Sequence, residues 1–186
     1  NSNHALRNLD AFENLSSIGW GLYIHNHDVL ESIQGLSGVS SIGRLLSIQR
    51  NKTLKTLEGL NQVATLPHYL SIWDNTALEN LDGLNEVSQV GTLYLVHNTS
   101  LTQIALPALT RIDYVLFMSN NDILENLDGF NNLSYVGDEV EIRENTSLTN
   151  FCGLQQLVQN NFNGEYNVVE NGSNPSQSDL STGNCD

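Results

Sequence analysis

Residues able to do chemistry are scattered along this sequence instead of being gathered into a catalytic motif. Acidic residues outnumber basic ones 21 to 7, and there are 5 histidines and 2 cysteines. The histidines have no regular metal-ligand spacing, and the sequence contains no G-x-S-x-G, H-E-x-x-H or phosphate-loop motif. Glycoside hydrolysis needs a pair of carboxylates flanking one groove. We therefore expect no catalytic site, no bound metal and no cofactor.

The net charge of −14 indicates which partners the surface disfavours. Such a surface repels both nucleic acid and anionic lipid. No run of 18 apolar residues occurs, so we expect neither a transmembrane helix nor direct insertion into a membrane. The acidity itself serves solubility, and adaptation to a salty exterior or weak calcium binding by scattered carboxylates are the alternatives.

Both cysteines, Cys152 and Cys185, lie in the last fifth of the chain, where the internal repeat fades. A disulfide between them would close the C-terminal segment, and such bonds belong to oxidising compartments. The alternative is two free thiols, one of them in the core.

These residues lie on an internal repeat of 23 or 24 residues. The repeat is marked by recurring leucines, at Leu30, Leu54, Leu78, Leu101, Leu124 and Leu148. Its consensus is L-x-I-x-x-N-x-x-L-x-x-L-x-G-L-x-x-V-x-x-V-G. Such a period predicts a mainly β solenoid, in which each coil buries its apolar side against its neighbours. We expect one domain over residues 1–186, with an N-terminal half-coil over 1–21, regular coils over 22–151 and a C-terminal cap over 152–186.

Each column of the repeat has a structural role. The L-x-I pair alternates with period two, which predicts a short strand with both side chains inward. The asparagine column predicts a buried ladder, because stacked amides satisfy the backbone groups of neighbouring turns. Its members are Asn51, Asn75, Asn98, Asn121 and Asn145, with His27 in the first coil. The glycine column is expected to supply unusual backbone angles at a corner, at Gly35, Gly59, Gly83, Gly129 and Gly153.

Two segments depart from the regular repeat. The fourth copy reads Ile104-Ala105-Leu106-Pro107 and lacks the corner glycine, so we expect Pro107 to fix that corner instead. In the cap, residues 153–160 have a helical pattern. Asn174-Pro175 then predicts a last short helix with Asn174 as its N-cap and Pro175 at the first helical position.

The outward strand positions bear on function, because the fold does not dictate their residue types. Alternation places a contiguous apolar and aromatic patch on the third to fifth strands, formed by Tyr69, Trp73, Tyr94, Val96, Val115 and Phe117, with Tyr23 on the first strand. Patches of this kind mark binding surfaces. Aromatic anchors suit either a protein hot spot or a sugar ring. The alternative is that the aromatic residues only stabilise the sheet through cross-strand pairs.

Six N-x-S/T sequons occur, and the expected fold divides them into two groups. Asn51, Asn98 and Asn145 are ladder positions, which we expect to be buried. The remaining candidates for glycosylation in a eukaryotic host are Asn14, Asn132 and Asn171.

The repeat resembles the receptor L-domain, the leucine-rich β-helix of insulin and epidermal growth factor receptors, of fungal cell-wall proteins and of bacterial surface proteins. The resemblance covers residues 3–185, and it is carried by residues 106–112 followed by 115–117, and by residues 140–145 leading to Leu148 and Cys152. It implies a right-handed, single-stranded β-helix that is secreted or displayed at the cell surface. Receptor L-domains carry more cysteines and less regular coils, so none of the family's hormone-binding residues is carried over.

Two functions are open for the outward strand face. The first is a binding module that engages a protein or glycan, as the resemblance implies. The second is a spacer or stalk in a larger surface protein, in which the same patch packs against a neighbouring domain or forms a homodimer.

Overall fold

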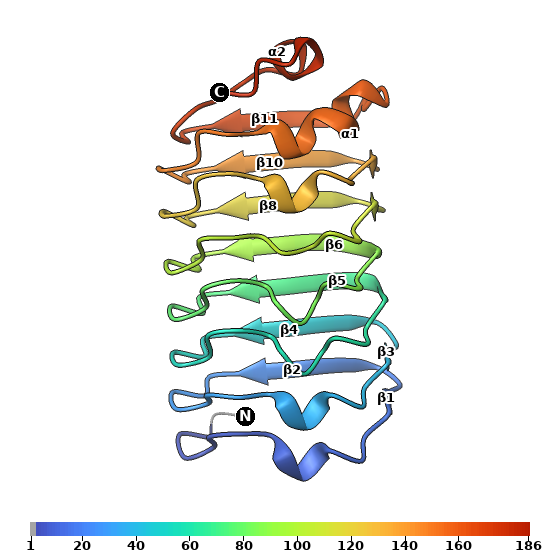
Figure 1. Cartoon of the computed structure of the whole chain (residues 1–186), viewed down its shortest axis with the longest axis vertical. Coiled ribbons are helices and arrows are strands. Elements are labelled where there is room, and N and C mark those ends of the chain that lie inside the picture. The colour runs from blue at the N-terminus through green and yellow to red at the C-terminus, as the bar shows by residue number, and fades with distance from the viewer. Residues whose placement is uncertain (1–2) are drawn as a thin grey trace.

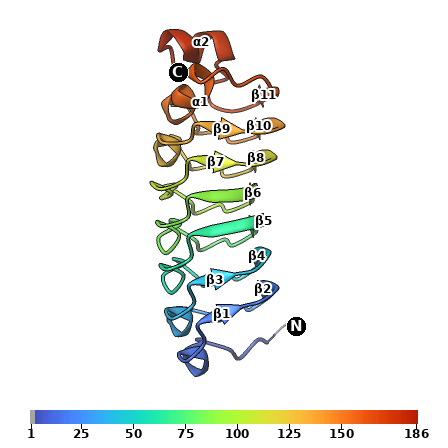
Figure 2. The same ribbon diagram turned by 90° about the vertical axis from the view of Figure 1, so that its right-hand side faces the viewer.

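Each copy of the repeat forms one coil of a parallel β-solenoid in the computed structural model, which describes residues 3–186 (Figure 1). The chain rises from coil to coil as a right-handed helix, with the strands along one side of the rod and the turns along the other (Figures 1 and 2). The predicted mainly β, right-handed β-helix is thus confirmed. One long parallel sheet contains β2 (Gly21–His25), β4 (Leu45–Gln49), β5 (Thr65–Trp73), β6 (Gln89–Val96), β8 (Val115–Ser119), β10 (Glu139–Arg143) and β11 (Glu165–Val169).

Shorter elements occupy the corners and the C-terminal end of the rod. Strands of two residues lie at β1 (Ser17–Ile18), β3 (Ser41–Ile42), β7 (Arg111–Ile112) and β9 (Tyr135–Val136). Strands β1 and β3 pair in a separate sheet, whereas β7 pairs with β6 and β9 within the long sheet. Single 3₁₀ turns lie at Asp10–Phe12, Gln34–Leu36, Asp128–Phe130 and Cys152–Leu154. Two short helices belong to the last part of the chain, α1 (Gln155–Gln159) and α2 (Gln177–Thr182).

The core is built by stacking identical repeat positions on one another. The register pairs Leu46 with Leu70 and Ile48 with Ile72, and all four side chains are completely buried. Leucine, isoleucine and valine columns at the other corners are buried in the same way. Because each coil covers only its neighbours, the stability of the rod is a sum over successive coil interfaces.

The asparagine column forms a continuous hydrogen-bonded ladder in the turn after each strand. The Asn75 Nδ2 group donates to the Ile48 carbonyl of the preceding coil at 2.9 Å, and the Asn75 backbone N–H donates to Oδ1 of Asn98 at 3.2 Å. Equivalent bonds join the other rungs. The turn is tight, and the residue before each rung is left-handed, with φ between 55° and 60°, at Asn26, Arg50, Asp74, His97, Asn120, Glu144 and Glu170.

The ladder continues beyond its expected last member. Asn171 Oδ1 accepts the Asn145 backbone N–H at 3.1 Å, and Asn171 Nδ2 donates to the Ile142 carbonyl at 2.8 Å. Asn171 is therefore a half-exposed rung of the ladder as well as a candidate for glycosylation, and a backbone carbonyl accepts a hydrogen bond from its amide nitrogen, as the Pro107 carbonyl does from that of Asn132 at 2.8 Å. The two exposed sequons are Asn14 and Asn132.

The corner glycines are required more by close approach between coils than by unusual backbone angles. Gly59 and Gly83 do have positive φ, of 117° and 108°. A Cβ on Gly129, by contrast, would lie 1.9 Å from the carbonyl oxygen of Ile104 in the coil below. The expectation of special angles is thus wrong at the three corners that form 3₁₀ turns, Gly35, Gly129 and Gly153.

The C-terminal cap closes the last coil with α1, β11 and α2. A disulfide joins Cys152 to Cys185, as predicted, across a sequence separation of 33. Helix α2 has Ser176 as its N-cap, because the Ser176 hydroxyl accepts the Asp179 N–H and the Asp179 carboxylate accepts the Ser176 N–H. The expectation that Asn174 caps this helix is wrong, since Asn174 instead forms the last rung of the ladder.

Candidate binding face on the strands

The outward side chains of the long sheet form one open surface, called here the strand face. Trp73 pairs with Val96 across β5 and β6, and Tyr94 pairs with Phe117 across β6 and β8. Neighbouring strands lie about 4.8 Å apart, so outward side chains in one column contact each other directly. All four of these side chains are half-buried by such contacts.

Three aromatic rings cross β5, β6 and β8 as one continuous row, the aromatic row of Tyr69, Tyr94 and Phe117. The Tyr69 and Tyr94 rings are stacked, with centroids 6.2 Å apart and planes inclined by 23°. The Tyr94 and Phe117 rings lie 5.8 Å apart at 54°. Val96 and Val115 are half-buried on the same strands. The row therefore makes an apolar strip along the middle of the strand face.

Trp73 lies at the end of β5 under an arginine that the sequence analysis does not single out. The Arg50 guanidinium carbon is 4.3 Å from the Trp73 ring centroid, a cation–π contact. Arg50 Nε is also 3.6 Å from Asp74 Oδ2. The repeat register could have predicted this pair. Gln49 pairs with Trp73, so the next residue, Arg50, lies beside the Trp73 ring.

Tyr23 stands apart from the aromatic row. Its column continues through Ser47 and Ser71 before it reaches Tyr94, so two short side chains separate the two tyrosines. The Tyr23 ring instead meets the His25 ring edge to face at 5.5 Å, and burial lowers the pKa of His25. The structure therefore does not join Tyr23 to the predicted patch.

Acidic side chains border the aromatic row on its C-terminal side. Strand β10 places Glu141 beside Phe117. Burial raises the pKa of Glu139, and repulsion from Glu165 and Glu141 raises it further by smaller amounts. The cation on the same strand, Arg143, is engaged with Glu141 at 2.9 Å. This border therefore carries net negative charge.

Other titratable side chains pair across coils instead of gathering at one point. His4 and Lys52 contact Asp28 at 2.6 and 2.7 Å, and Lys55 contacts Glu79 at 2.8 Å. Within residues 3–186, no three side chains of His, Cys, Asp or Glu are placed to share a metal ion. No helix in this part of the chain is both long enough and apolar enough to cross a bilayer.

A hollow on the turn side of the rod is a further feature that the repeat pattern did not predict. It opens at the fourth coil, between residues 82–85 and residues 126–132. The signal that points to it is the spacing of 23 from Asn98 to Asn121, together with the absent corner glycine.

Comparison of the chain with protein-family models, with curated proteins and with solved structures finds no match in any of the three. The chemistry open to the strand face therefore follows from its own geometry. That geometry consists of the aromatic row, the Arg50–Trp73 pair and the acidic border.

Proposed function

We propose that the chain is a secreted or cell-surface binding module, similar to a receptor L-domain, that engages a protein ligand through its strand face. The observation that carries this proposal is the aromatic row, which lies outward although the coils already contain a continuous buried core. Exposed apolar patches on soluble domains mark interaction sites. A glycan laid on the same rings is the other ligand class, and the experiment below separates the two.

Stabilisation of the sheet accounts for only part of the aromatic row. Aromatic pairs contribute about 0.5–1.5 kcal/mol each beyond their buried area. Tyr69 nevertheless keeps 46% of its surface exposed after pairing with Tyr94. A rigid ring left at the water boundary can anchor a partner at little entropic cost, which is why Tyr and Trp dominate interface hot spots.

The charge of the strand face favours a basic protein as the ligand. The chain has a net charge of −14, and Glu139, Glu141 and Glu165 lie along one border of the aromatic row. Complementary charge steers association and raises its rate. We therefore expect a ligand with lysine or arginine around an apolar centre, and an association rate that falls as salt concentration rises.

The disulfide supports an extracellular location for the proposed module. Both cysteines of the chain are used in the Cys152–Cys185 bond. Such bonds form and persist in oxidising compartments and are rare in the cytosol. Secretion or surface display would place the strand face where it can meet a ligand.

A spacer that self-associates through the strand face is the alternative function. Two copies meeting through this face would each bring a charge of −14, which opposes association at low salt. Light scattering of the chain distinguishes the two functions. We expect a monomer, whereas a dimer that dissociates on Phe117→Asp would favour the spacer.

The test compares ligand binding by two matched variants. The chain, a Trp73→Ala/Tyr94→Ala double variant and a Tyr135→Ala control are applied to immobilised extracellular proteins and to immobilised glycans. Tyr135 is a matched control, because its ring is exposed and lies 3.8 Å from the Arg111 guanidinium carbon, yet it belongs to β9, which pairs with β7 and with none of the strands that carry the aromatic row.

A protein ligand that binds at least about tenfold more weakly to the double variant, and normally to the control, would support the proposal. Ligands that are found only among the glycans and bind more weakly to the double variant would replace a protein by a glycan as the ligand of the strand face. Binding that is unchanged in the double variant would refute a role for the strand face.

A further inference from the structure

The fourth coil lacks one residue at the corner opposite the strands. In the third and fifth coils, four residues (81–84 and 127–130) form a turn closed by a backbone hydrogen bond of 3.1 and 2.9 Å, respectively. In the fourth coil, residues 104–106 follow the same path with three residues, too few for that turn. The expectation that Pro107 fixes this corner is wrong, because Pro107 lies in the following turn, which the third coil also has.

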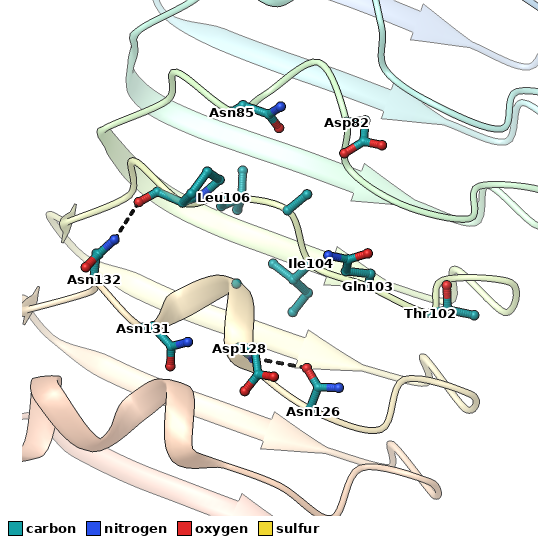
Figure 3. Close-up of a pocket in the computed structure, with 13 residues that line it drawn as sticks. Asp82, Asn85, Thr102, Gln103, Ile104, Leu106, Asn126, Asp128, Asn131 and Asn132 are labelled. Carbon is teal, nitrogen blue, oxygen red and sulfur yellow. Dashed lines mark hydrogen bonds between the residues drawn. The ribbon is translucent and has the colours of Figure 1, made fainter.

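The missing turn leaves a hollow of about 550 Å³ between the corners of the third and fifth coils. Figure 3 shows Asp82 and Asn85 on one side of it, Asp128 and Asn131 on the other, and Ile104 between them. Pockets for small ligands commonly have volumes of about 300–1,000 Å³. The hollow thus has the size of a ligand site, with polar walls and an apolar floor.

Three polar groups in the walls of the hollow have no hydrogen-bond partner among residues 3–186, namely the carboxylates of Asp82 and Asp128 and the amide oxygen of Asn85. In the first two coils, Gln34 Nε2 donates to Glu58 Oε2 at 3.0 Å across this corner column. The next two members of the column, Asp82 and Asp128, are separated by the deleted position, and neither carboxylate bonds to another residue among 3–186. Asn85 Oδ1 is buried and accepts no hydrogen bond from the described chain, which is a destabilising arrangement. Rotation of the Asn85 amide can turn either its oxygen or its NH₂ group toward a ligand.

We infer that this hollow binds a neutral saccharide. Carboxylates accept and amides both accept and donate hydrogen bonds, which matches the hydroxyl groups of a sugar. Residues 104–107 line the floor of the hollow, where Ile104 and Leu106 are buried and Ala105 and Pro107 keep the exposed apolar surface that the C–H face of the ring can contact. Charge-assisted acceptance by Asp82 and Asp128 makes the hydroxyl contacts stronger than neutral ones.

Charged ligands fit the hollow poorly. No Lys, Arg or His of the described residues lines it, and the net charge of −14 repels anions. A calcium ion needs its oxygen ligands at about 2.3–2.6 Å. Asp82 and Asp128 stand two coils apart, roughly 9.5 Å by the strand spacing, which is too far for both to hold one ion.

The hollow and the strand face are separate sites. Figure 2 shows the turns and the long strands on opposite sides of the rod, and the residues lining the hollow lie outside the strands of the aromatic row. The inference therefore does not rest on the proposed function of the strand face. Loss of one site leaves the other to be tested.

The test is a titration of the isotope-labelled full chain, followed by NMR. The probes are glucose, galactose, mannose and N-acetylglucosamine, with maltotriose and chitotriose as longer chains. Calcium chloride and sodium sulfate are the charged controls. We expect at least one saccharide to shift the backbone amides of Asp82, Asn85 and Gln103, with a Kd below about 10 mM.

Restoring the missing residue gives the most direct variant. Ala105→Asp followed by one inserted glycine rebuilds the turn of the neighbouring coils, so binding should be lost while the melting temperature is kept or raised. Asp82→Asn should weaken binding by at least about tenfold, and it carries the test if the insertion variant does not fold. Glu58→Gln is the matched control, because Glu58 occupies the same column away from the hollow.

Three results would overturn the inference. The first is that no saccharide binds with a Kd below about 10 mM. The second is that the shifted amides lie outside the hollow, or that binding survives Asp82→Asn unchanged. The third is that calcium or sulfate, and none of the sugars, shifts the amides around Asp82.

Discussion

Asn98→Ala removes one internal rung of the asparagine ladder, and the structure allows its cost to be worked out. Asn98 Oδ1 accepts the backbone N–H and the Nδ2 group of Asn75, at 3.2 and 3.3 Å. Asn98 Nδ2 donates to the Ile72 carbonyl at 3.0 Å and to Asn121 Oδ1 at 3.4 Å. The side chain is completely buried, so water cannot take its place without opening the coil.

The loss is dominated by the buried Asn75 N–H, which is left without the acceptor that Asn98 supplies. An orphaned buried donor costs about 1–3 kcal/mol, and each further neutral hydrogen bond contributes about 0.5–1.5 kcal/mol. One orphaned donor with two or three lost bonds gives a loss of about 3–5 kcal/mol in the free energy of unfolding. This loss is a large share of the free energy of unfolding of a typical domain, which is about 5–15 kcal/mol.

Urea unfolding followed by far-UV circular dichroism measures this loss. Asn171→Ala is the matched control, because Asn171 makes the same kinds of bond at the half-exposed end of the ladder. Water can replace the lost partners there, so we expect a cost of about 1 kcal/mol. Hydrogen exchange at the Asn75 amide should accelerate in Asn98→Ala. A cost for Asn98→Ala no larger than that for Asn171→Ala would refute the reasoning.

Two further predictions concern the corners and the cap. Gly137→Ala is expected to lower the free energy of unfolding by about 1–3 kcal/mol, because the added Cβ would lie 1.9 Å from a carbonyl oxygen of the coil below. Gly19→Ala is the control at the same repeat position. It should leave the stability unchanged, because nothing lies within 4 Å of the added Cβ. Equal thermal melts for these two variants would contradict this account. Cys152→Ser opens the Cys152–Cys185 loop, whose separation of 33 predicts a loss of roughly 4 kcal/mol from loop entropy. Urea unfolding of the oxidised protein and of this variant measures it, and coincident midpoints would show that the bond does not constrain the unfolded chain.

The inward and outward columns could be predicted because the repeat length alone sets the register of a parallel solenoid. A period of 24 places Leu46 beside Leu70, and alternation along the strand then determines which side chains face the core. The buried asparagines follow from the same stacking, since a side chain that repeats at one position must bond to its own copies. The strand-face columns that carry Tyr94 and Phe117 could be predicted for the same reason.

Features that depend on the distance between coils could not be predicted in this way. The glycine column reads as a set of special backbone angles, but Gly129 is needed because a carbonyl of the next coil occupies the space of a side chain. Asn171 and Asn174 are predicted as a sequon and a helix cap, and their place as rungs of the ladder is seen only when the fading repeat stacks on it. The separation of Tyr23 from the aromatic row likewise needs the strands between them to be in place.

The sequence by itself determined the coil, its register and the residue types of every column, because a repeat interacts chiefly with its own copies. Only the tertiary structure decided what happens where a copy departs from the rule. Deletion of one residue at Ala105 is a small local change in the sequence, yet it opens a hollow, because the flanking coils keep their spacing and cannot close over the gap. Arg50 covers Trp73 for a related reason, since two residues in different coils become neighbours only when the coils stack.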